Sequence, residues 1–154
     1  MNWDEYFINI MDTVATKSKD TNTKIGCVLV GPDREIRSTG YNSFPRGLDD
    51  NVKKRFERPL KYKFFEHAER NALYNAARIG VSVKGCVSYQ SWLPCTDCAR
   101  GLINAGIIEI VYDYRPSNPW IARTDNIWDE DMTIANEMLL ECGVNIRKYG
   151  GRKS

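Results

Sequence analysis

The sequence predicts an α/β fold in three layers, α/β/α, with a mixed five-stranded sheet in the middle. From residue 66 onward, segments of strand character alternate with segments of helical periodicity, an order typical of parallel strands joined by helices. Before them, two apolar runs are separated by the turn Gly31-Pro32-Asp33, which predicts an antiparallel hairpin. The chain has 154 residues, enough for one substantial core, so we expect a single domain over residues 1–154.

The N-terminal part predicts one helix, the hairpin and a long connection. Residues 3–14 carry apolar side chains at helical spacing, so they predict an amphipathic helix. Residues 25–30 and 35–41 are the two strands of the hairpin. Residues 42–63 lack clean periodicity, and we expect a long loop or lid with one short helical turn. Loops of this length are usually functional or disordered.

The C-terminal part supplies the remaining helices and strands. Residues 66–79 predict a helix that Gly80 ends, and residues 95–105 predict one between Pro94 and Gly106. A further helix around residues 134–139 ends at Gly143. Strands are expected over 85–90, 107–112 and 144–149, and the tail over 150–154 is expected to fray.

Composition limits the compartment and the partners. The net charge is only +2, from 22 basic and 20 acidic side chains, which argues against a binder of polymeric nucleic acid. No apolar run approaches the ~20 residues that span a bilayer, so we expect no membrane partner. The first residues are acidic where a secretory signal is basic. We therefore expect a cytoplasmic protein.

Five cysteines fall into two groups. An odd number in a chain without an export signal indicates free thiols or metal ligands. Cys27, Cys86 and Cys142 have apolar surroundings in the sequence, and we expect buried, inert thiols there. Cys95 and Cys98 differ because of the residues around them.

The feature that indicates chemistry is His67-Ala68-Glu69 followed by Pro94-Cys95-Thr96-Asp97-Cys98. This H-x-E…P-C-x-x-C pattern is the signature of zinc nucleobase deaminases. A catalytic zinc ion needs three protein ligands and one open position. His67 is the only histidine of the chain, and together with Cys95 and Cys98 it supplies those three. The two cysteines lie three residues apart in the first turn of a predicted helix, where the helix dipole favours thiolates.

Glu69 is the predicted catalytic residue. Two residues beyond His67, it is poorly placed as a zinc ligand but well placed beside the water that zinc activates. Zinc lowers the pKa of that water, and Glu69 accepts its proton. Glu69 then returns protons to the ring nitrogen and to the departing ammonia.

Each half of the pattern has a plainer interpretation. A lone histidine in a helix is usually a partly buried polar residue, and a lone C-x-x-C is a redox pair or half of a structural zinc site. A redox pair leaves His67 unexplained. A structural zinc site needs a fourth ligand, and the chain has no second histidine. The two motifs together therefore favour a deaminase site.

Four segments resemble the deoxycytidylate (dCMP) deaminases of the cytidine deaminase superfamily. They are residues 23–27, 40–47, 65–73 and 93–107, in the order that the family has them. The resemblance implies a cytidine-deaminase-like fold and the hydrolysis of dCMP to dUMP and ammonia, which supplies dTMP synthesis. Some relatives hold a second, structural zinc with His and Cys residues in the insert after residue 42. This chain has neither type over 42–63, so we expect one Zn²⁺ per subunit.

The resemblance also implies contacts with a nucleotide substrate. The family's asparagine at the position of Asn42 binds the sugar and base, although asparagine is also common in turns. Trp92 and Leu93 help to wall the base pocket by resemblance, or else Trp92 only packs the sheet edge. The matched segments add Thr23, Lys24, Ala68 and Pro94 to the predicted substrate site. Lys24, Arg115 and Arg123 are candidates for the 5′-phosphate.

Regulation is a further implication. Many family members are hexamers that dCTP activates and dTTP inhibits, and the helix with Tyr74, Asn75 and Arg78 is one that relatives use for subunit contacts. Residues 46–63 carry seven basic and three acidic side chains, which is either a solvated loop or an anion site. The effector site, with Mg²⁺ accompanying the triphosphate, is then expected at Asn42, Arg46, Gly47, Arg58, Lys61 and Tyr62. Ser43 stands where the family usually has glycine.

Other functions remain open from the sequence. The nearest is deamination of another free cytosine nucleotide or nucleoside, such as dCTP or cytidine, and free cytosine belongs to the same group. Deamination of bases in RNA or DNA fits the charge balance poorly. A zinc-stabilised binding module without turnover does not explain Glu69.

Overall fold

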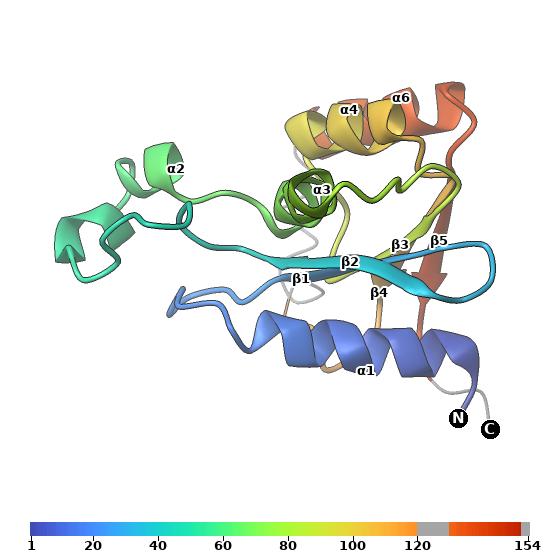
Figure 1. Ribbon diagram of the computed structural model, residues 1–154, viewed down its shortest axis with the longest axis horizontal. Coiled ribbons are helices and arrows are strands. Elements are labelled where there is room, and N and C mark those ends of the chain that lie inside the picture. The colour runs from blue at the N-terminus through green and yellow to red at the C-terminus, as the bar shows by residue number, and fades with distance from the viewer. Residues whose placement is uncertain (120–129, 152–154) are drawn as a thin grey trace.

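The structure is a computed structural model that describes residues 1–119 and 130–151. Five strands form one sheet in the order β2-β1-β3-β4-β5 (Figure 1). The strands are β1 (Gly26–Val30), β2 (Ile36–Tyr41), β3 (Val87–Gln90), β4 (Glu109–Asp113) and β5 (Asn145–Tyr149). The helices are α1 (Trp3–Ala15), η1 (Lys53–Phe56), α2 (Lys61–Phe64), α3 (Ala68–Ile79), α4 (Thr96–Ala105) and α6 (Glu130–Glu141).

The sheet is mixed, as the sequence predicted. Strand β1 pairs antiparallel with both β2 and β3, whereas β3, β4 and β5 run parallel to one another. The hairpin over β1 and β2 is confirmed. The carboxyl end of β3 leads directly into the segment before α4, so the parallel part of the sheet carries the cysteine motif.

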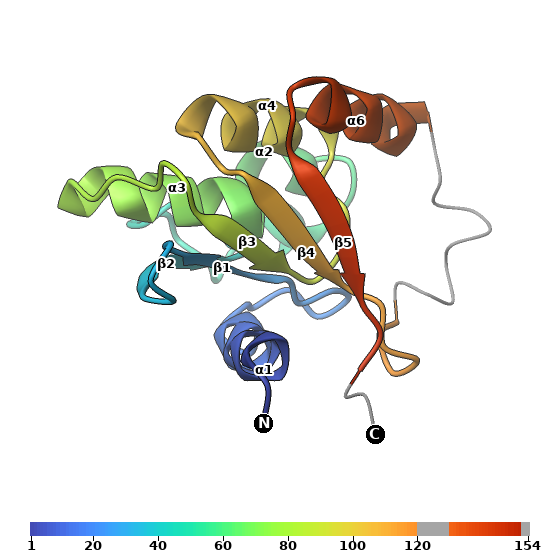
Figure 2. The same cartoon turned by 90° about the vertical axis from the view of Figure 1, so that its right-hand side faces the viewer.

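Helices cover both faces of the sheet, which confirms the three layers. Of the helices in the described residues, α1 covers one face, and α3, α4 and α6 lie on the other (Figures 1 and 2). The first face buries an aromatic and aliphatic cluster that includes Phe7, Met11 and Tyr89. The second buries small side chains of α3, Ala68, Ala72 and Ala76, against residues of the sheet, α4 and α6.

Close packing of α3 on the sheet depends on Gly40 in β2. A Cβ atom at this position would lie 2.3 Å from the backbone nitrogen of Ala72 and 2.4 Å from the carbonyl oxygen of Ala68. Only glycine permits this approach of strand and helix. The contact fixes the start of α3, which carries the predicted catalytic residues.

The insert between β2 and α3 projects beyond the end of the sheet (Figure 1). We expected one short helical turn in this stretch, and the structure has two short helices, η1 and α2. The insert has an aromatic cluster of its own, in which the ring centroids of Phe44 and Phe65 lie 4.3 Å apart and those of Phe44 and Phe56 lie 5.0 Å apart. This cluster explains why a segment without regular periodicity has a defined structure.

The structure corrects the expectation for Cys142, and other expectations concern residues outside the described ranges. Cys142 is exposed, whereas we expected it to be buried like Cys27 and Cys86. It follows the last residue of α6, where Gly143 at φ 81° turns the chain toward β5. Arg123 and the tail residues 152–154 lie outside the described residues. Within the described part, no helix has the length and apolar character needed to cross a bilayer.

Candidate metal centre and active site

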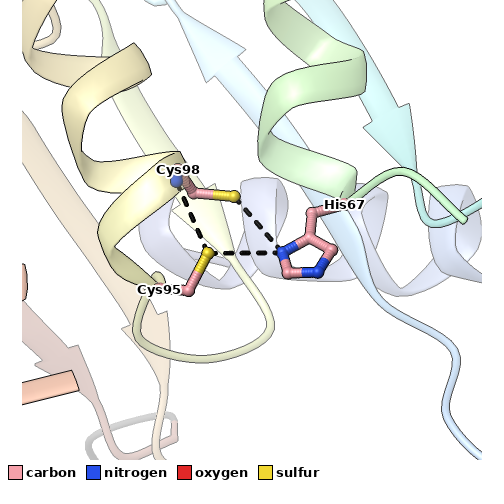
Figure 3. A group of neighbouring side chains, drawn as sticks. All are labelled: His67, Cys95 and Cys98. Atoms are coloured by element: carbon pink, nitrogen blue, oxygen red, sulfur yellow. Dashed lines mark hydrogen bonds between the residues drawn. The ribbon is translucent and has the colours of Figure 1, made fainter. Parts of the chain in front are cut away.

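His67, Cys95 and Cys98 come together at the starts of two neighbouring helices. The Nδ1 atom of His67 lies 3.4 Å from the Sγ atom of Cys95 and 3.5 Å from that of Cys98. Figure 3 shows both sulfur atoms reaching from α4 toward the imidazole at the start of α3. Among the described residues, these three side chains form a group whose possible ligand atoms all lie within 4.8 Å of one another.

The spacing of the three atoms fits a zinc ion. With Zn–S of about 2.3 Å and Zn–N of about 2.0 Å, a tetrahedral centre places sulfur and nitrogen ligands about 3.5 Å apart. The observed separations of 3.4 and 3.5 Å agree with that value. The three residues also differ in solvent exposure: Cys98 is buried, Cys95 is partly buried and His67 is exposed. A site that is open on one side leaves room for a fourth, exchangeable ligand, as catalytic zinc requires.

Two of the ligands are N-cap residues and not members of the helices themselves. We expected the helices to start at residues 66 and 95, but α3 begins at Ala68 and α4 at Thr96. Cys95 has the extended backbone of an N-cap, and its sulfur accepts a hydrogen bond from the backbone N–H of Cys98 at 3.4 Å. His67 caps α3 without a side-chain hydrogen bond because its ring turns toward the cysteines. Both helix dipoles therefore point their positive ends at the cluster.

The electrostatics favour a negative sulfur at this position. The pKa of the Cys95 thiol is lowered to about 4, because its hydrogen bonds outweigh the effect of burial. These hydrogen bonds involve the Cys98 side chain, His67 and the backbone N–H of Cys98. The same hydrogen bond to Cys95, together with burial, raises the pKa of Cys98. Among the protein groups alone, one thiolate and one thiol share the site, and the hydrogen bond to Cys95 raises the pKa of His67. Such a polarised pair is suited to a divalent cation.

Glu69 lies in the first turn of α3 and is only 6% exposed. Burial raises the pKa of its carboxyl group, while the charge of His67 and a hydrogen bond from the Cys98 side chain act in the opposite direction. The carboxyl group therefore adjoins the metal-binding cluster without being part of it. A buried carboxyl group with a raised pKa is suited to accept and return protons near neutral pH.

An ionic link that we did not predict joins the two ligand-bearing helices. The Nε atom of Arg70 lies 2.6 Å from a carboxylate oxygen of Glu66, and one of its terminal nitrogens lies 3.5 Å from Asp97. Glu66 in turn accepts the backbone N–H of His67 at 3.0 Å. Asp97 lies between the two cysteine ligands. The spacing of Glu66 and Arg70, four residues apart beside His67, was the available signal in the sequence.

Side-chain hydrogen bonds of Ser88 and Gln90 in β3 fix the loop between β3 and α4. Gln90, which is fully buried, donates to the carbonyl oxygen of Trp92 at 2.8 Å and accepts from Ser88 at 2.7 Å. Trp92, Leu93 and Pro94 are buried, and the Trp92 ring stacks on Tyr114 at a centroid distance of 6.1 Å. Ala68 is buried at the start of α3. The predicted wall residues thus lie in a fixed loop that leads directly to Cys95.

Thr23 and Lys24 line a cavity of about 360 Å³ together with Ser91, Arg115 and Asn118. Two of the three phosphate candidates therefore share one cavity. The guanidinium group of Arg115 is engaged by Asp113 at 2.8 Å and by Asp12 at 2.9 Å. Lys24 donates to the carbonyl oxygen of Ser18 at 2.9 Å and is otherwise exposed.

The amide of Asn42 is engaged within the protein. Its Oδ1 atom accepts the backbone N–H of Ile25 at 2.8 Å, and its Nδ2 atom donates to the carbonyl oxygen of Thr23 at 2.9 Å. The side chain therefore fixes the segment that carries Thr23 and Lys24. Its predicted contact with the nucleotide stays a prediction.

The predicted effector residues do not form one group. Arg46 and Gly47 line a cavity of about 530 Å³ whose wall includes Tyr74, Asn75 and Arg78 of α3. Lys61 is buried against Asp20, and Tyr62 is 63% exposed on the insert. Arg58 lies over the Tyr62 ring at 5.8 Å and lines a different hollow.

Ser43 does not need the left-handed conformation that glycine would allow. Among the described residues, Arg34 is the non-glycine residue with a positive φ, so the φ of Ser43 is not positive. Ser43 pairs with Glu66 as an isolated antiparallel bridge, with N–H···O distances of 3.1 and 2.8 Å. Asn71 of α3 donates to the Ser43 hydroxyl at 3.2 Å. Serine therefore fits here because the position does not require a positive φ.

The sequence of the chain matches known proteins over the segments that carry the cluster. The family description "Cytidine and deoxycytidylate deaminase zinc-binding region" matches residues 1–114, which include all three cluster residues and Glu69. Human deoxycytidylate deaminase is 34% identical over 155 residues, covering 97% of this chain and 80% of the human protein. The mouse deoxycytidylate deaminase is 32% identical with the same coverage.

Solved structures agree on the fold. The dCMP deaminase of cyanophage S-TIM5, crystallised in complex with dCMP and dUMP, superimposes with a TM-score of 0.72. The alignment covers 94% of this chain and 95% of the phage protein at 22% sequence identity. At that identity the likeness supports the three-layer architecture with its mixed sheet.

Proposed function

Because the chain belongs to the cytidine and deoxycytidylate deaminase family, we propose that it is a zinc-dependent enzyme that hydrolyses dCMP to dUMP and ammonia. The observation that carries this proposal is the cluster of His67, Cys95 and Cys98 beside the buried carboxyl group of Glu69. Deoxycytidylate deaminases from human and mouse match nearly the whole chain, which supports dCMP as the substrate. The chain acts as one domain with one catalytic zinc ion.

The proposed mechanism divides the work among these residues. His67, Cys95 and Cys98 would hold a zinc ion, which would supply the acidity that makes water a nucleophile at neutral pH. Glu69 takes a proton from the attacking water and delivers it to the ring nitrogen of cytosine. Glu69 then takes the proton of the hydroxyl group added to the ring carbon and passes it to the exocyclic amine. The C–N bond breaks, the carbonyl group of dUMP forms, and ammonia leaves. The fixed loop Trp92–Leu93–Pro94 excludes water beside the base.

Lys24 and Arg115 support recognition of the 5′-phosphate. Both line the cavity that Thr23 also lines, and Asn42 fixes the backbone of that segment. Arg115 is already paired with two carboxylates, so Lys24 is the cation with more freedom to meet a phosphate. We therefore assign Lys24 the larger share of phosphate binding.

A substrate panel tests the function. Purified protein is expected to deaminate dCMP with a kcat/KM at least about 100-fold above that for deoxycytidine, because one lost charge-assisted contact costs about 3 kcal/mol. The panel also contains dCTP, cytidine, cytosine and single-stranded oligonucleotides, measured by ammonia release. A higher kcat/KM for dCTP or cytidine than for dCMP would contradict the assignment.

We also propose regulation by nucleoside triphosphates in a homohexamer within the cytoplasm. The 530 Å³ cavity supports the binding of a nucleoside triphosphate. Its basic side chains are Lys17, Lys19, Arg46 and Arg78, against the acidic Asp50 and Glu66. Aromatic rings of Tyr41, Phe44, Phe65 and Tyr74 complete the wall, and Asn71 and Asn75 offer amides. A triphosphate with Mg²⁺ matches such a lining in charge.

Calorimetry decides the regulatory proposal. We expect dCTP and dTTP, each with Mg²⁺, to bind with dissociation constants in the micromolar range, and Arg46→Ala to weaken both by about tenfold. Arg34→Ala serves as the control, because Arg34 lies in the distant β1–β2 turn and contacts the Trp3 ring instead. No saturable binding below millimolar concentrations would contradict the proposal.

A further inference from the structure

Asp20, in the segment between α1 and β1, links three parts of the chain. One of its carboxylate oxygens lies 2.7 Å from the ammonium group of Lys61 in α2, and the side chains are 7% and 9% exposed. The other oxygen accepts the backbone N–H groups of Asn22 at 2.9 Å and Thr23 at 3.4 Å. Asn42, at the end of β2, donates to the first oxygen at 3.4 Å.

The contacts of Asp20 and Asn42 hold residues 18–25 in one conformation. Asn42 binds this segment through Ile25 and Thr23, as described above, and its carbonyl oxygen accepts the hydroxyl of Ser18 at 2.9 Å. The segment presents Thr23 and Lys24 to the 360 Å³ cavity. Two ion pairs therefore join the insert to the predicted substrate-binding segment in the described structure, the exposed pair of Lys19 and Asp50 and the buried pair of Lys61 and Asp20.

The side chain of Lys61 points into the protein and not toward solvent. Its ammonium group lies between Asp20 and the ring of Phe65, at 5.3 Å from the ring centroid. Burial alone would raise the pKa of Asp20, but the hydrogen bond from Lys61 and the backbone N–H groups lower it, so the carboxylate is charged. Two charges buried to this extent are stable only as a pair, and removal of one leaves the other uncompensated.

We propose that Lys61 is a positioning residue for substrate binding, whose buried ion pair with Asp20 couples the insert to the segment that presents Thr23 and Lys24. The proposal rests on the proposed function, because dCMP is the ligand whose binding it affects. Loss of the pair then changes the position of Thr23 and Lys24, and with it the affinity for substrate. The effect is expected on KM and not on kcat, because neither Lys61 nor Asp20 takes part in the proton transfers of Glu69.

The test begins with Lys61→Met, which keeps the length of the side chain and removes its charge. We expect KM for dCMP to rise about tenfold while kcat and zinc content stay at wild-type values. Hydrogen exchange at the backbone N–H groups of Asn22 and Thr23 should accelerate by a similar factor. Lys63→Met is the matched control, because Lys63 is exposed on the same short helix and carries the same charge.

A double variant separates positioning from general destabilisation. Asp20→Asn combined with Lys61→Met leaves no buried charge without a partner but still lacks the link, so we expect KM to stay raised. Recovery of the wild-type KM would mean that an uncompensated charge, and not the lost link, caused the effect of Lys61→Met, and would overturn the proposal. Should Lys61→Met fail to fold, the double variant is measured in its place and should show the same rise in KM relative to the wild type. An unchanged KM in Lys61→Met, or an equal rise in Lys63→Met, would overturn the proposal.

The two proposals fail in different ways. Absence of dCMP turnover in the wild-type enzyme would count against the proposed function. Hydrogen exchange needs no substrate, so unchanged exchange at Asn22 and Thr23 in Lys61→Met would overturn the positioning role whatever the substrate is.

Discussion

Replacement of Glu69 by glutamine is expected to lower kcat for dCMP by about 10³- to 10⁴-fold while the zinc content stays at one ion per chain. The carboxyl group is buried beside His67 and Cys98 but is not one of the three clustered ligand residues. Glutamine keeps its shape and hydrogen-bonding reach and loses only the ability to accept a proton. The loss should therefore fall on kcat, with KM changed by a few-fold at most.

The measurement combines steady-state kinetics with metal analysis of the same preparations. Glu66→Gln is the matched control, since Glu66 is a carboxylate three residues earlier that caps His67 and pairs with Arg70. We expect it to reduce activity far less, by about tenfold or below, because it acts only on the position of His67. Wild-type turnover in Glu69→Gln, or loss of its zinc, would contradict the assigned role.

The sequence predicted those parts of the site that depend on local spacing. His67, Glu69, Cys95 and Cys98 each lie within a turn of a helix start, and Gly80 and Gly106 mark the corresponding helix ends. Alternation of strands and helices then brings two such starts to one edge of the sheet. The fold class followed from the same alternation, and it holds across all five strands.

The parts that failed depend on contacts between distant segments. Lys61 and Asp20 are 41 positions apart, and no pattern in the sequence indicates that a lysine in a basic insert is buried. The basic residues of the insert left a solvated loop and an anion site equally open, and neither interpretation indicates that Lys61 lies inward against Phe65 while Tyr62 lies outward. Cys142 shows the same limit at a smaller scale, because burial after a helix end depends on where Gly143 directs the chain.

Replacement of Cys98 by serine is expected to abolish both stoichiometric zinc and detectable activity. Serine keeps the shape of the side chain but is a poor ligand for zinc at neutral pH, and the remaining pair supplies only two of three ligands. Cys98 is also the most buried of the three, so its loss leaves the innermost side of the site without a donor. Cys142→Ser is the matched control, because that thiol is exposed beyond the end of α6.

Thermal unfolding gives a readout that does not depend on turnover. A chelator should lower the Tm of the wild-type protein by about 10 °C, since a tightly bound ion contributes about 4 kcal/mol when it is well above its dissociation constant. The Tm of Cys98→Ser should start near the chelated value and show no response to chelator, whereas Cys142→Ser should follow the wild type. If Cys98→Ser kept a chelator-sensitive Tm, the ion would be held elsewhere, and the distances of 3.4 and 3.5 Å would reflect hydrogen bonding alone. The two cysteine variants thus decide between a metal centre and a hydrogen-bonded cluster at the same helix termini.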